Sequence, residues 1–362
     1  MNSDGTVYFI GAGASRQDKF PLTSELKHGI AWAILKEPSR FDLLRYHLKY
    51  LYHVYPNSLK QSAVMWDRLC APKNDSKTPR CQIPDVTDLL SSLDWIIREQ
   101  SSFGPSHETR VREKRAKIDQ LPEVRDLVVQ ALCYSLGIYH DNHKAHTAKR
   151  FINLISPTNS LITTNWDLLL DKARHKKFGT LPEDYGTTGE VHLGKRKAPT
   201  PTMSERPKLL KLHGSLSWRY CQRCQRLVID PMHHVAGDRE ARTCECICTY
   251  KYSELIVTPG FVREYRNLHL LNIWREALVA LANAAHWVFI GYSLPADDVG
   301  IQTLLLKARC VRTDRGYGPP HVTIVTGRDG TETQARYRRI LAKAELFQGD
   351  FCDYVMQMDA TS

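Results

Sequence analysis

The chain contains several short apolar runs. Longer polar and helical stretches separate them. Residues 7–10 form one such run, which ends at Gly11 and is typical of a buried strand that enters a glycine turn. Strands that are apolar along their whole length belong to parallel sheets covered on both faces, with helices as crossovers. The pattern therefore predicts an α/β fold, a Rossmann-like doubly wound parallel sheet. The other runs of this form are 161–164, 209–212, 287–290 and 322–325.

A long helix-rich stretch separates the first two predicted strands. Apolar residues recur at helical spacing over 86–97 and over 124–136, which predicts two amphipathic helices there. We expect a large helical insertion at 23–150, with 1–22 and 151–362 forming the sheet-bearing domain. The segment 179–207 is rich in Gly, Thr, Pro and Lys without a clear period, which predicts a surface loop.

Composition narrows the class of protein. The chain has 362 residues, 42% of them hydrophobic and 25% charged, which is typical of a soluble globular protein. Its net charge of +11 attracts polyanions in general, but no aromatic residues interleave with the basic runs, so direct nucleic-acid binding is not favoured. No apolar run reaches the roughly 18 residues of a membrane span, and no secretory signal is visible. We expect a cytoplasmic protein without membrane contact.

Five of the ten cysteines lie between positions 221 and 248. Their spacing, a C-x-x-C pair followed by C-x-C-x-C, supplies the thiolates of a structural Zn²⁺ site, which needs four. We expect a small zinc-binding module at 216–252 within the sheet-bearing domain. The predicted ligands are Cys221, Cys224, Cys244 and Cys248, with Cys246 as the alternative to one of the second pair.

Polar or glycine-rich residues follow four of the predicted strands. They are the turn 11–15, Asn165 with Asp167, His213, and the segment 291–293. Taken singly, Asn165 could be a helix cap and His213 a core histidine. In an open α/β sheet, however, ligands bind outside the carboxyl ends of the strands. Convergence of the four segments there favours a binding site.

With these residues in place, the chain resembles the sirtuin superfamily, and more closely its bacterial sirtuin-like NAD hydrolase branch of anti-phage defence. The resemblance spans most of the chain in family order. It rests on Gly-Ala-Gly-Ala-Ser at 11–15, Thr-Thr-Asn-Trp-Asp at 163–167, Lys-Leu-His-Gly-Ser at 211–215, the cysteines at 221–248, Ile-Val-Thr-Pro at 256–259, and Gly-Tyr-Ser-Leu-Pro-Ala-Asp-Asp at 291–298.

The resemblance implies NAD as substrate and a structural Zn²⁺. It places Asn165 and His213 at the nicotinamide ribose as catalytic residues, and Asp167 at the carboxamide. A histidine that titrates near neutral pH is suited to accept a proton there. The residues implied in NAD binding are Gly11, Ala12, Gly13, Ser15, Asp167, Gly291 and Ser293.

Two departures from the family shape the expected activity. Residues 18–22 and 258–261 lack the loops that support an acyl-lysine channel in protein deacylases, whereas the NAD-site motifs are retained. Thr326 stands where the family often has Asn. We expect an NAD⁺ hydrolase (NADase) that releases nicotinamide and ADP-ribose; the alternatives are an NAD-dependent deacylase or ADP-ribosyltransferase, or a non-catalytic NAD or ADP-ribose sensor. Family analogy suggests a homo-oligomer, or a companion such as a DNA-translocating ATPase or a short prokaryotic Argonaute.

Overall fold

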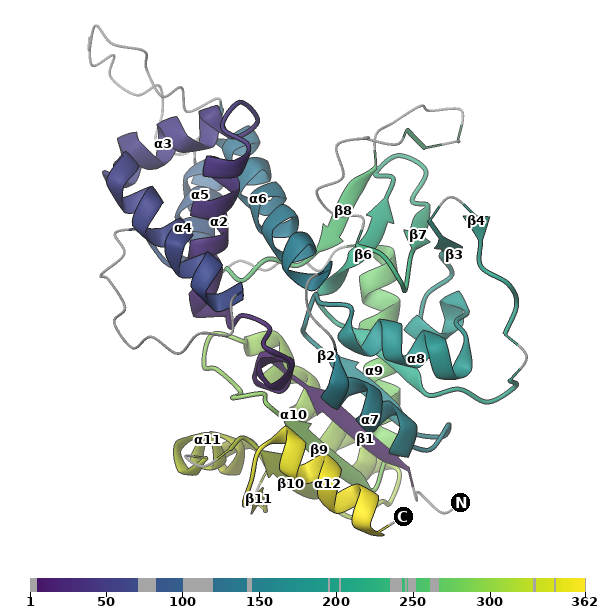
Figure 1. The fold of residues 1–362 in the computed structure, drawn as a ribbon. Helices are drawn as coiled ribbons and strands as arrows, with labels where there is room; N and C mark the ends of the chain where they lie inside the picture. The colour runs from purple at the N-terminus through teal and green to yellow at the C-terminus, as the bar shows by residue number, and fades with distance from the viewer. Residues whose placement is uncertain are drawn as a thin grey trace, which may run out of the picture.

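The structure, a computed structural model, contains a six-stranded parallel sheet, which lies in the lower half of Figure 1. Its order is β11-β10-β9-β1-β2-β5, which confirms the predicted Rossmann-like doubly wound sheet. The strands are β1 (Thr6–Ile10), β2 (Ser160–Thr163), β5 (Lys208–Lys211), β9 (His286–Ile290), β10 (His321–Val325) and β11 (Glu345–Phe347). The structure describes residues 5–70, 83–99, 120–141, 145–194, 196–201, 203–234, 243–244, 246, 252–260, 267–327, 330–341 and 343–361.

The strand order contains one switch point. From β1 the chain adds β2 and β5 on one side, and later β9, β10 and β11 on the other. The connections that leave β1 and β9 therefore diverge at the carboxyl edge, where they open a crevice for a ligand. One segment follows each of these strands: residues 11–15 come directly after β1, and residues 291–293 come directly after β9.

Helices cover both faces of the sheet. In Figure 1, α7 and α12 lie in front of the sheet, and α9 and α10 lie behind it. The ring of Phe151 on α7 packs 5.0 Å from that of Tyr8 on β1 and 5.3 Å from that of Phe351 on α12. The helices of this domain are α7 (His146–Leu154), α8 (Leu169–Phe178), α9 (Leu268–Asn283), α10 (Val299–Asp314), α11 (Thr331–Ile340) and α12 (Phe351–Thr361).

The helices between β1 and β2 include both that the sequence predicts. Between the short helix α1 (Ala12–Ser15) and α7, these are α2 (Leu26–Lys36), α3 (Asp42–Tyr52), α4 (Pro56–Cys70), α5 (Val86–Glu99) and α6 (Leu121–Asp141). Helix α2 packs against both α4 and α6. The expected boundary at residue 150 falls inside α7, whose amides at Thr147 and Ala148 donate to the Asp18 carboxylate at 3.0 and 3.2 Å. Within the described ranges, no helix has the length and apolar character needed to cross a membrane.

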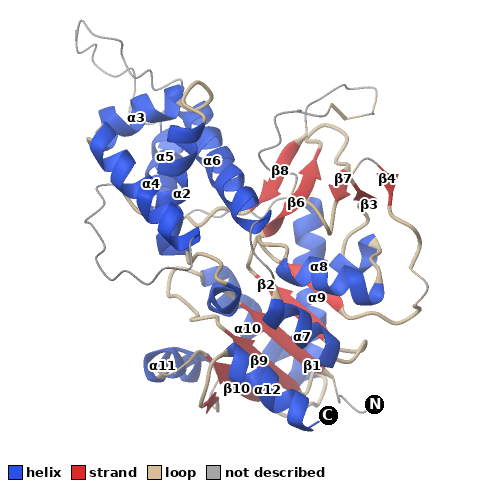
Figure 2. Cartoon of the chain, viewed as in Figure 1, coloured by secondary structure: helices blue, strands red, loops and turns tan. Residues whose placement is uncertain are grey.

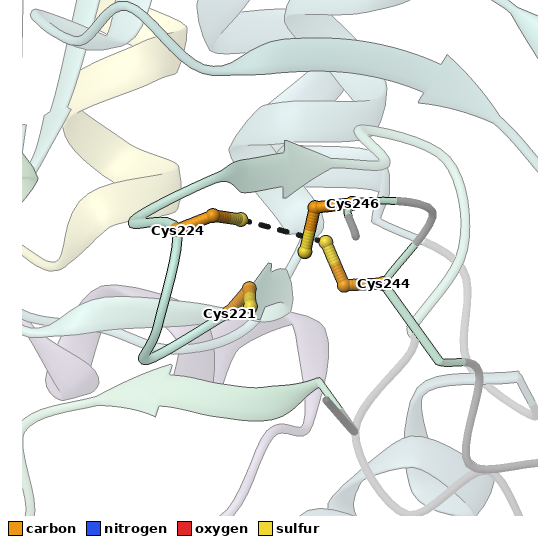
Figure 3. A group of neighbouring side chains, drawn as sticks. All are labelled: Cys221, Cys224, Cys244 and Cys246. Carbon is orange, nitrogen blue, oxygen red and sulfur yellow. Dashed lines mark hydrogen bonds between the residues drawn. The ribbon is translucent and has the colours of Figure 1, made fainter. Parts of the chain in front are cut away.

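A second, five-stranded sheet lies beside the first (Figure 2). Two of its strands fall in 179–207, which the sequence predicted to be a surface loop; that prediction was wrong for these residues. The cysteines at 221–224 follow β6, and Figure 3 shows Cys244 and Cys246 opposite them. The strands, in sheet order, are β4 (Arg196–Lys197), β3 (Glu190–Leu193), β7 (Leu227–Ile229), β6 (Gly214–Tyr220) and β8 (Ser253–Ile256).

The basic run at residues 172–177 is partly buried in the fold. Arg174 is fully buried, pairs with Asp184 at 2.9 Å, and donates to the carbonyl of Pro207 at 2.6 Å. Within the same run, Lys177 donates to the carbonyls of Ile152 and Asn153. This arginine ties α8 to the chain that leads into β5. The basic residues at 110–117 lie outside the described residues.

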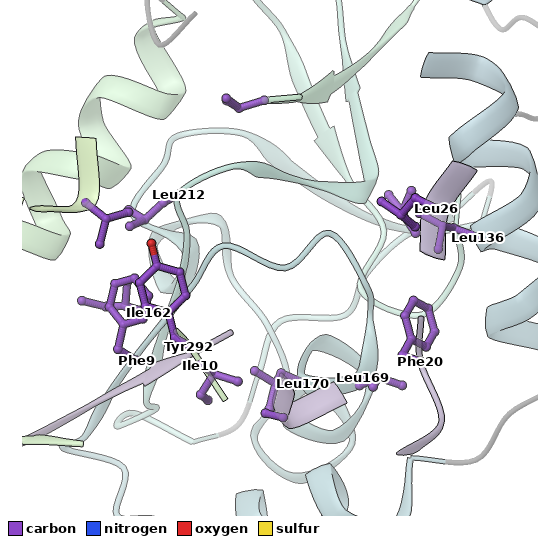
Figure 4. Close-up of a cluster of buried hydrophobic side chains, with 14 of the residues drawn as sticks. Phe9, Ile10, Phe20, Leu26, Leu136, Ile162, Leu169, Leu170, Leu212 and Tyr292 are labelled. Carbon is purple, nitrogen blue, oxygen red and sulfur yellow. The ribbon is translucent and has the colours of Figure 1, made fainter. Parts of the chain in front are cut away.

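The core is continuous from the sheet to the helical insertion. In Figure 4, Phe9, Ile162 and Tyr292 form one group of side chains from β1, β2 and the segment after β9. Phe20 and Leu26 form another group with Leu136 of α6. The segments that follow β1 and β9 are thus held in place by apolar packing.

Candidate functional site

The turn after β1 is locked against the segment after β9. The Gly13 amide donates to the Gly291 carbonyl at 2.8 Å, and the Gly11 amide to the Ile290 carbonyl at 2.9 Å. Gly291 has φ +62°, and a Cβ built on it would lie 2.0 Å from the Ala14 nitrogen. Only glycine fits such a close approach of two backbones. The two segments at the switch point therefore form one compact unit.

A chain of hydrogen bonds joins the residues after β1 to those after β2. The Asn165 side-chain amide donates to Ser15 Oγ at 2.9 Å, and Ser15 Oγ donates to Asp167 Oδ2 at 2.8 Å. The other carboxylate oxygen of Asp167 accepts from the amide of Leu169 at 3.1 Å. Ser15 is thus in direct contact with both Asn165 and Asp167, which lie far from it in the sequence.

The surroundings of the Asp167 carboxyl group shift its pKa. It is buried, and this desolvation raises its pKa above the ordinary value for aspartate. The positive charge of Lys211 opposes the rise most strongly, the hydrogen bonds from Ser15 and Leu169 add to that opposition, and the charge of Asp171 reinforces the rise. A shifted carboxyl group in a cleft marks a candidate functional residue.

These residues open onto a cavity of about 670 Å³, a volume suited to a nucleotide-sized ligand. His213, at the end of β5, is buried, and its carbonyl accepts from the Val257 amide at 2.8 Å. Gly11 does not line the cavity; its role is the backbone contact with Ile290 and Tyr292. The predicted residues that do line it are Ala12, Gly13, Ser15, Asn165, Asp167, His213, Gly291 and Ser293.

The helical insertion supplies a wall of this cavity that the sequence did not reveal. Residues 85–88, at the start of α5, and residues 22–24 with Leu26 line it. The sequence showed Asp85 only as part of a helix start, a signal without functional content. Thr326, at the end of β10, also lines the cavity. The site is therefore shared between the sheet and the insertion.

Comparison with known proteins assigns the family. A family model described as SIR2-like domain matches residues 159–347, more than half of the chain. The chain belongs to this SIR2-like family. The matched region runs from β2 to β11, so it includes Asn165, Asp167 and His213 but neither the 11–15 turn nor the helical insertion. Membership supports an NAD-dependent activity in general.

Two solved structures are among those similar to this SIR2-like chain. One is Sir2Tm bound to a propionylated peptide, with 14% identity over 99% of this chain and 92% of that chain and a TM-score of 0.40. The other is a Sir2–p53 peptide–NAD⁺ complex, with 14% identity over 99% of this chain and 94% of that chain and a TM-score of 0.43. No curated protein sequence matches the chain.

The cysteine cluster of this SIR2-like protein has the size of a zinc site (Figure 3). The sulfur atoms of Cys221, Cys224, Cys244 and Cys246 all lie within 4.8 Å of one another, and those of Cys224 and Cys244 are 3.5 Å apart. Four thiolates at about 2.3 Å from a tetrahedral zinc lie roughly 3.8 Å apart, so the cluster fits the ion. The predicted ligand Cys248 lies outside the described residues, and the alternative Cys246 takes its place in the cluster.

The oxidation state of Cys246 decides whether this cysteine can bind zinc. Its sulfur takes part in a disulfide bond, whereas Cys221, Cys224 and Cys244 are free thiols. Zinc binds thiolates, so Cys246 can serve as the fourth ligand only after reduction. A closed four-thiolate site is architectural, and it would fix the turn after β6 beside the second sheet.

Proposed function

We propose that this SIR2-like protein hydrolyses NAD⁺ at the nicotinamide N-glycosidic bond and releases nicotinamide and ADP-ribose. The carrying observation is that Asn165, Ser15 and Asp167 form one hydrogen-bonded chain on a cavity that His213 also lines. That cavity lies at the switch point of a parallel sheet, where such folds bind ligands.

The charge of the cavity suits the two ends of NAD⁺ differently. Among the described residues, no Lys or Arg lines the cavity, so the phosphates would bind to backbone amides of the 11–15 turn and to the hydroxyl of Ser293. The buried carboxylate of Asp167 would accept a hydrogen bond from the nicotinamide carboxamide. Asp85 and Asp88 add negative charge to the wall, which would attract the positively charged nicotinamide ring.

Cleavage moves one electron pair and adds one water. The C1′–N bond breaks with its electrons going to the nicotinamide nitrogen, and positive charge develops on the ribose. Water then forms a bond to C1′, and His213 accepts the proton that the water loses. Within the described part of the chain, nothing is bonded to the amide oxygen of Asn165, so that oxygen can orient the water.

The wall of the cavity favours water, and not an acylated peptide, as the group that accepts ADP-ribose. The insertion covers it with residues 22–24 and 85–88, and the sequence lacks the loops that support an acyl-lysine channel in deacylases. Continuous hydrolysis would exhaust the NAD of the host cell. We therefore include control by assembly in the proposal, through self-association or a companion ATPase or short Argonaute, with NAD depletion in anti-phage defence as the output.

The test is incubation of the purified protein with NAD and no peptide, with nicotinamide and ADP-ribose followed by chromatography. Asn165→Ala and His213→Ala should each lower kcat by about 100-fold or more, since each removes a group that acts at the reacting centre. Asn153→Ala, on the exposed side of α7, is the matched control and should retain the wild-type rate. Cleavage that requires an acylated peptide, or wild-type protein that leaves NAD intact alone and with its partner, would refute the proposal.

A further inference from the structure

A buried ion pair lies directly behind the Asp167 carboxylate. Lys211 on β5 is 1% exposed and Asp171 on α8 is 1% exposed, and Lys211 Nζ lies 2.8 Å from Asp171 Oδ2. The same ammonium donates to the backbone carbonyl of Asp167. The hydroxyl of Tyr185, which is fully buried, donates to the other oxygen of Asp171 at 2.8 Å. Each charged group is thus fixed by at least two partners.

The cost of this arrangement argues for a role beyond packing. Taking an ammonium and a carboxylate out of water is expensive, and an apolar pair of similar volume often stabilises a core at least as well. Lys211 stands two positions before His213, and Asp171 four positions after Asp167. One ammonium therefore joins the two chain segments that carry the proposed catalytic and binding side chains.

The same ammonium acts on the charge of Asp167. Burial raises the pKa of Asp167, and the positive charge of Lys211 is the strongest influence that lowers it again. The other groups that act on this carboxyl are Ser15 and the Leu169 amide, which lower its pKa, and Asp171, which raises it. Removal of the whole pair would therefore raise the pKa of Asp167, because the loss of Lys211 outweighs the loss of Asp171.

We propose that Lys211, held in place by Asp171 and Tyr185, is a positioning residue that fixes Asp167 and keeps its carboxylate charged to accept the carboxamide of NAD. This inference rests on the proposed function, because its test follows the cleavage of NAD. It concerns residues behind the cavity wall, since neither Lys211 nor Asp171 lines the cavity itself.

The variant that tests it removes both charges together. A single change would leave the other charge buried without its partner and would destabilise the fold strongly. The double variant Lys211→Met with Asp171→Asn avoids this, and the new amide oxygen can still accept from Tyr185. Lys208→Met is the matched control: Lys208 lies on the same strand, pairs with Glu276 and is 44% exposed at its side chain.

The decisive measurement is kcat/KM for NAD cleavage against pH, with thermal unfolding of each variant alongside. We expect the acid limb of the double variant to move up by about one pH unit, which lowers the rate about tenfold below the limb and little above it. Lys208→Met should follow the wild-type curve. A purely structural role would lower the rate by one factor at every pH, and that result, or an unchanged profile, would overturn the inference.

A binding measurement separates this inference from the proposed function. If the wild type binds NAD without cleaving it, the proposed function fails, and NAD affinity measured by calorimetry against pH replaces kcat/KM. The double variant should then lose affinity at low pH and recover it at high pH. Equal affinity loss at every pH, no change, or a wild type that does not bind NAD would each overturn the inference.

Discussion

Substitution of Gly291 by alanine should disrupt the site through the backbone alone. The added methyl would lie 2.0 Å from the Ala14 nitrogen and 2.5 Å from the Gly13 carbonyl carbon. Both contacts are with backbone atoms, so no side-chain rotation can relieve them. The 11–15 turn must move away, and the hydrogen bond from the Gly13 amide to the Gly291 carbonyl is lost with it.

The expected magnitude has two parts. Holding alanine at φ +62° costs about 1–2 kcal/mol, because an L-residue is strained in the left-handed region. Overpacking of a tight contact adds about 1–3 kcal/mol. Gly316→Ala separates the two parts: Gly316 has φ +75° with nothing within 4 Å of the added Cβ, so only the first applies. We expect Gly291→Ala to lower the free energy of unfolding by about 3 kcal/mol and Gly316→Ala by about 1.

The assay combines denaturant unfolding with NAD binding by calorimetry. Gly291→Ala should bind NAD at least tenfold more weakly in protein that is still folded, because the displaced turn carries the amides proposed to bind the phosphates. Gly316→Ala should bind NAD as the wild type does. Equal affinity in both variants would refute the reasoning, since it would mean that the contact between the two segments does not shape the site.

Two further outcomes test other parts of the structure. Under reducing conditions the protein should hold one zinc per chain by metal analysis, and Cys246→Ser should lower that content while Cys248→Ser retains it; the reverse would return Cys248 to the fourth position. Ser15→Ala removes the donor to Asp167 and the acceptor for Asn165. The loss of that hydrogen bond raises the pKa of Asp167, so NAD cleavage should fall more at low pH than at high pH; a uniform fall would contradict this.

The parallel sheet was predictable because its strands are covered on both faces. Five of its strands contain a short run of buried apolar residues, and small or polar residues come at or just after the strand end, so a short local pattern identifies them. The strand β11 escaped prediction because it is a three-residue edge strand that begins with an exposed glutamate. The strands β3 and β4 escaped for a related reason: β3 is half-buried throughout and β4 is exposed, so neither alternates.

Most of the candidate site was predictable for a different reason: the carboxyl ends of parallel strands must meet at one edge. The strand pattern alone therefore predicted that Asn165, Asp167 and His213 belong to one site, although the sequence shows no contact between them. It could not find Lys211, because a lysine at a strand end is ordinarily solvated, and only the fold shows that Asp171 lies against it. Nor could it find Asp85, whose place in the wall depends on how the insertion packs.

The insertion makes direct contacts with segments next to the site. These contacts bear on our proposal that assembly controls the activity. The chain runs from the 11–15 turn through residues 16–22 into the insertion. The Tyr139 hydroxyl on α6 lies within hydrogen-bond distance of the carbonyl oxygens of Lys19 and, at 3.1 Å, Leu69. The Arg125 guanidinium, also on α6, donates to Thr258 Oγ1 at 3.3 Å, next to Val257 and Pro259 in the cavity wall. A rearrangement of α6 would therefore act on the segment that follows the glycine turn and on the wall. A partner that binds the insertion can alter the cavity without touching the parallel sheet.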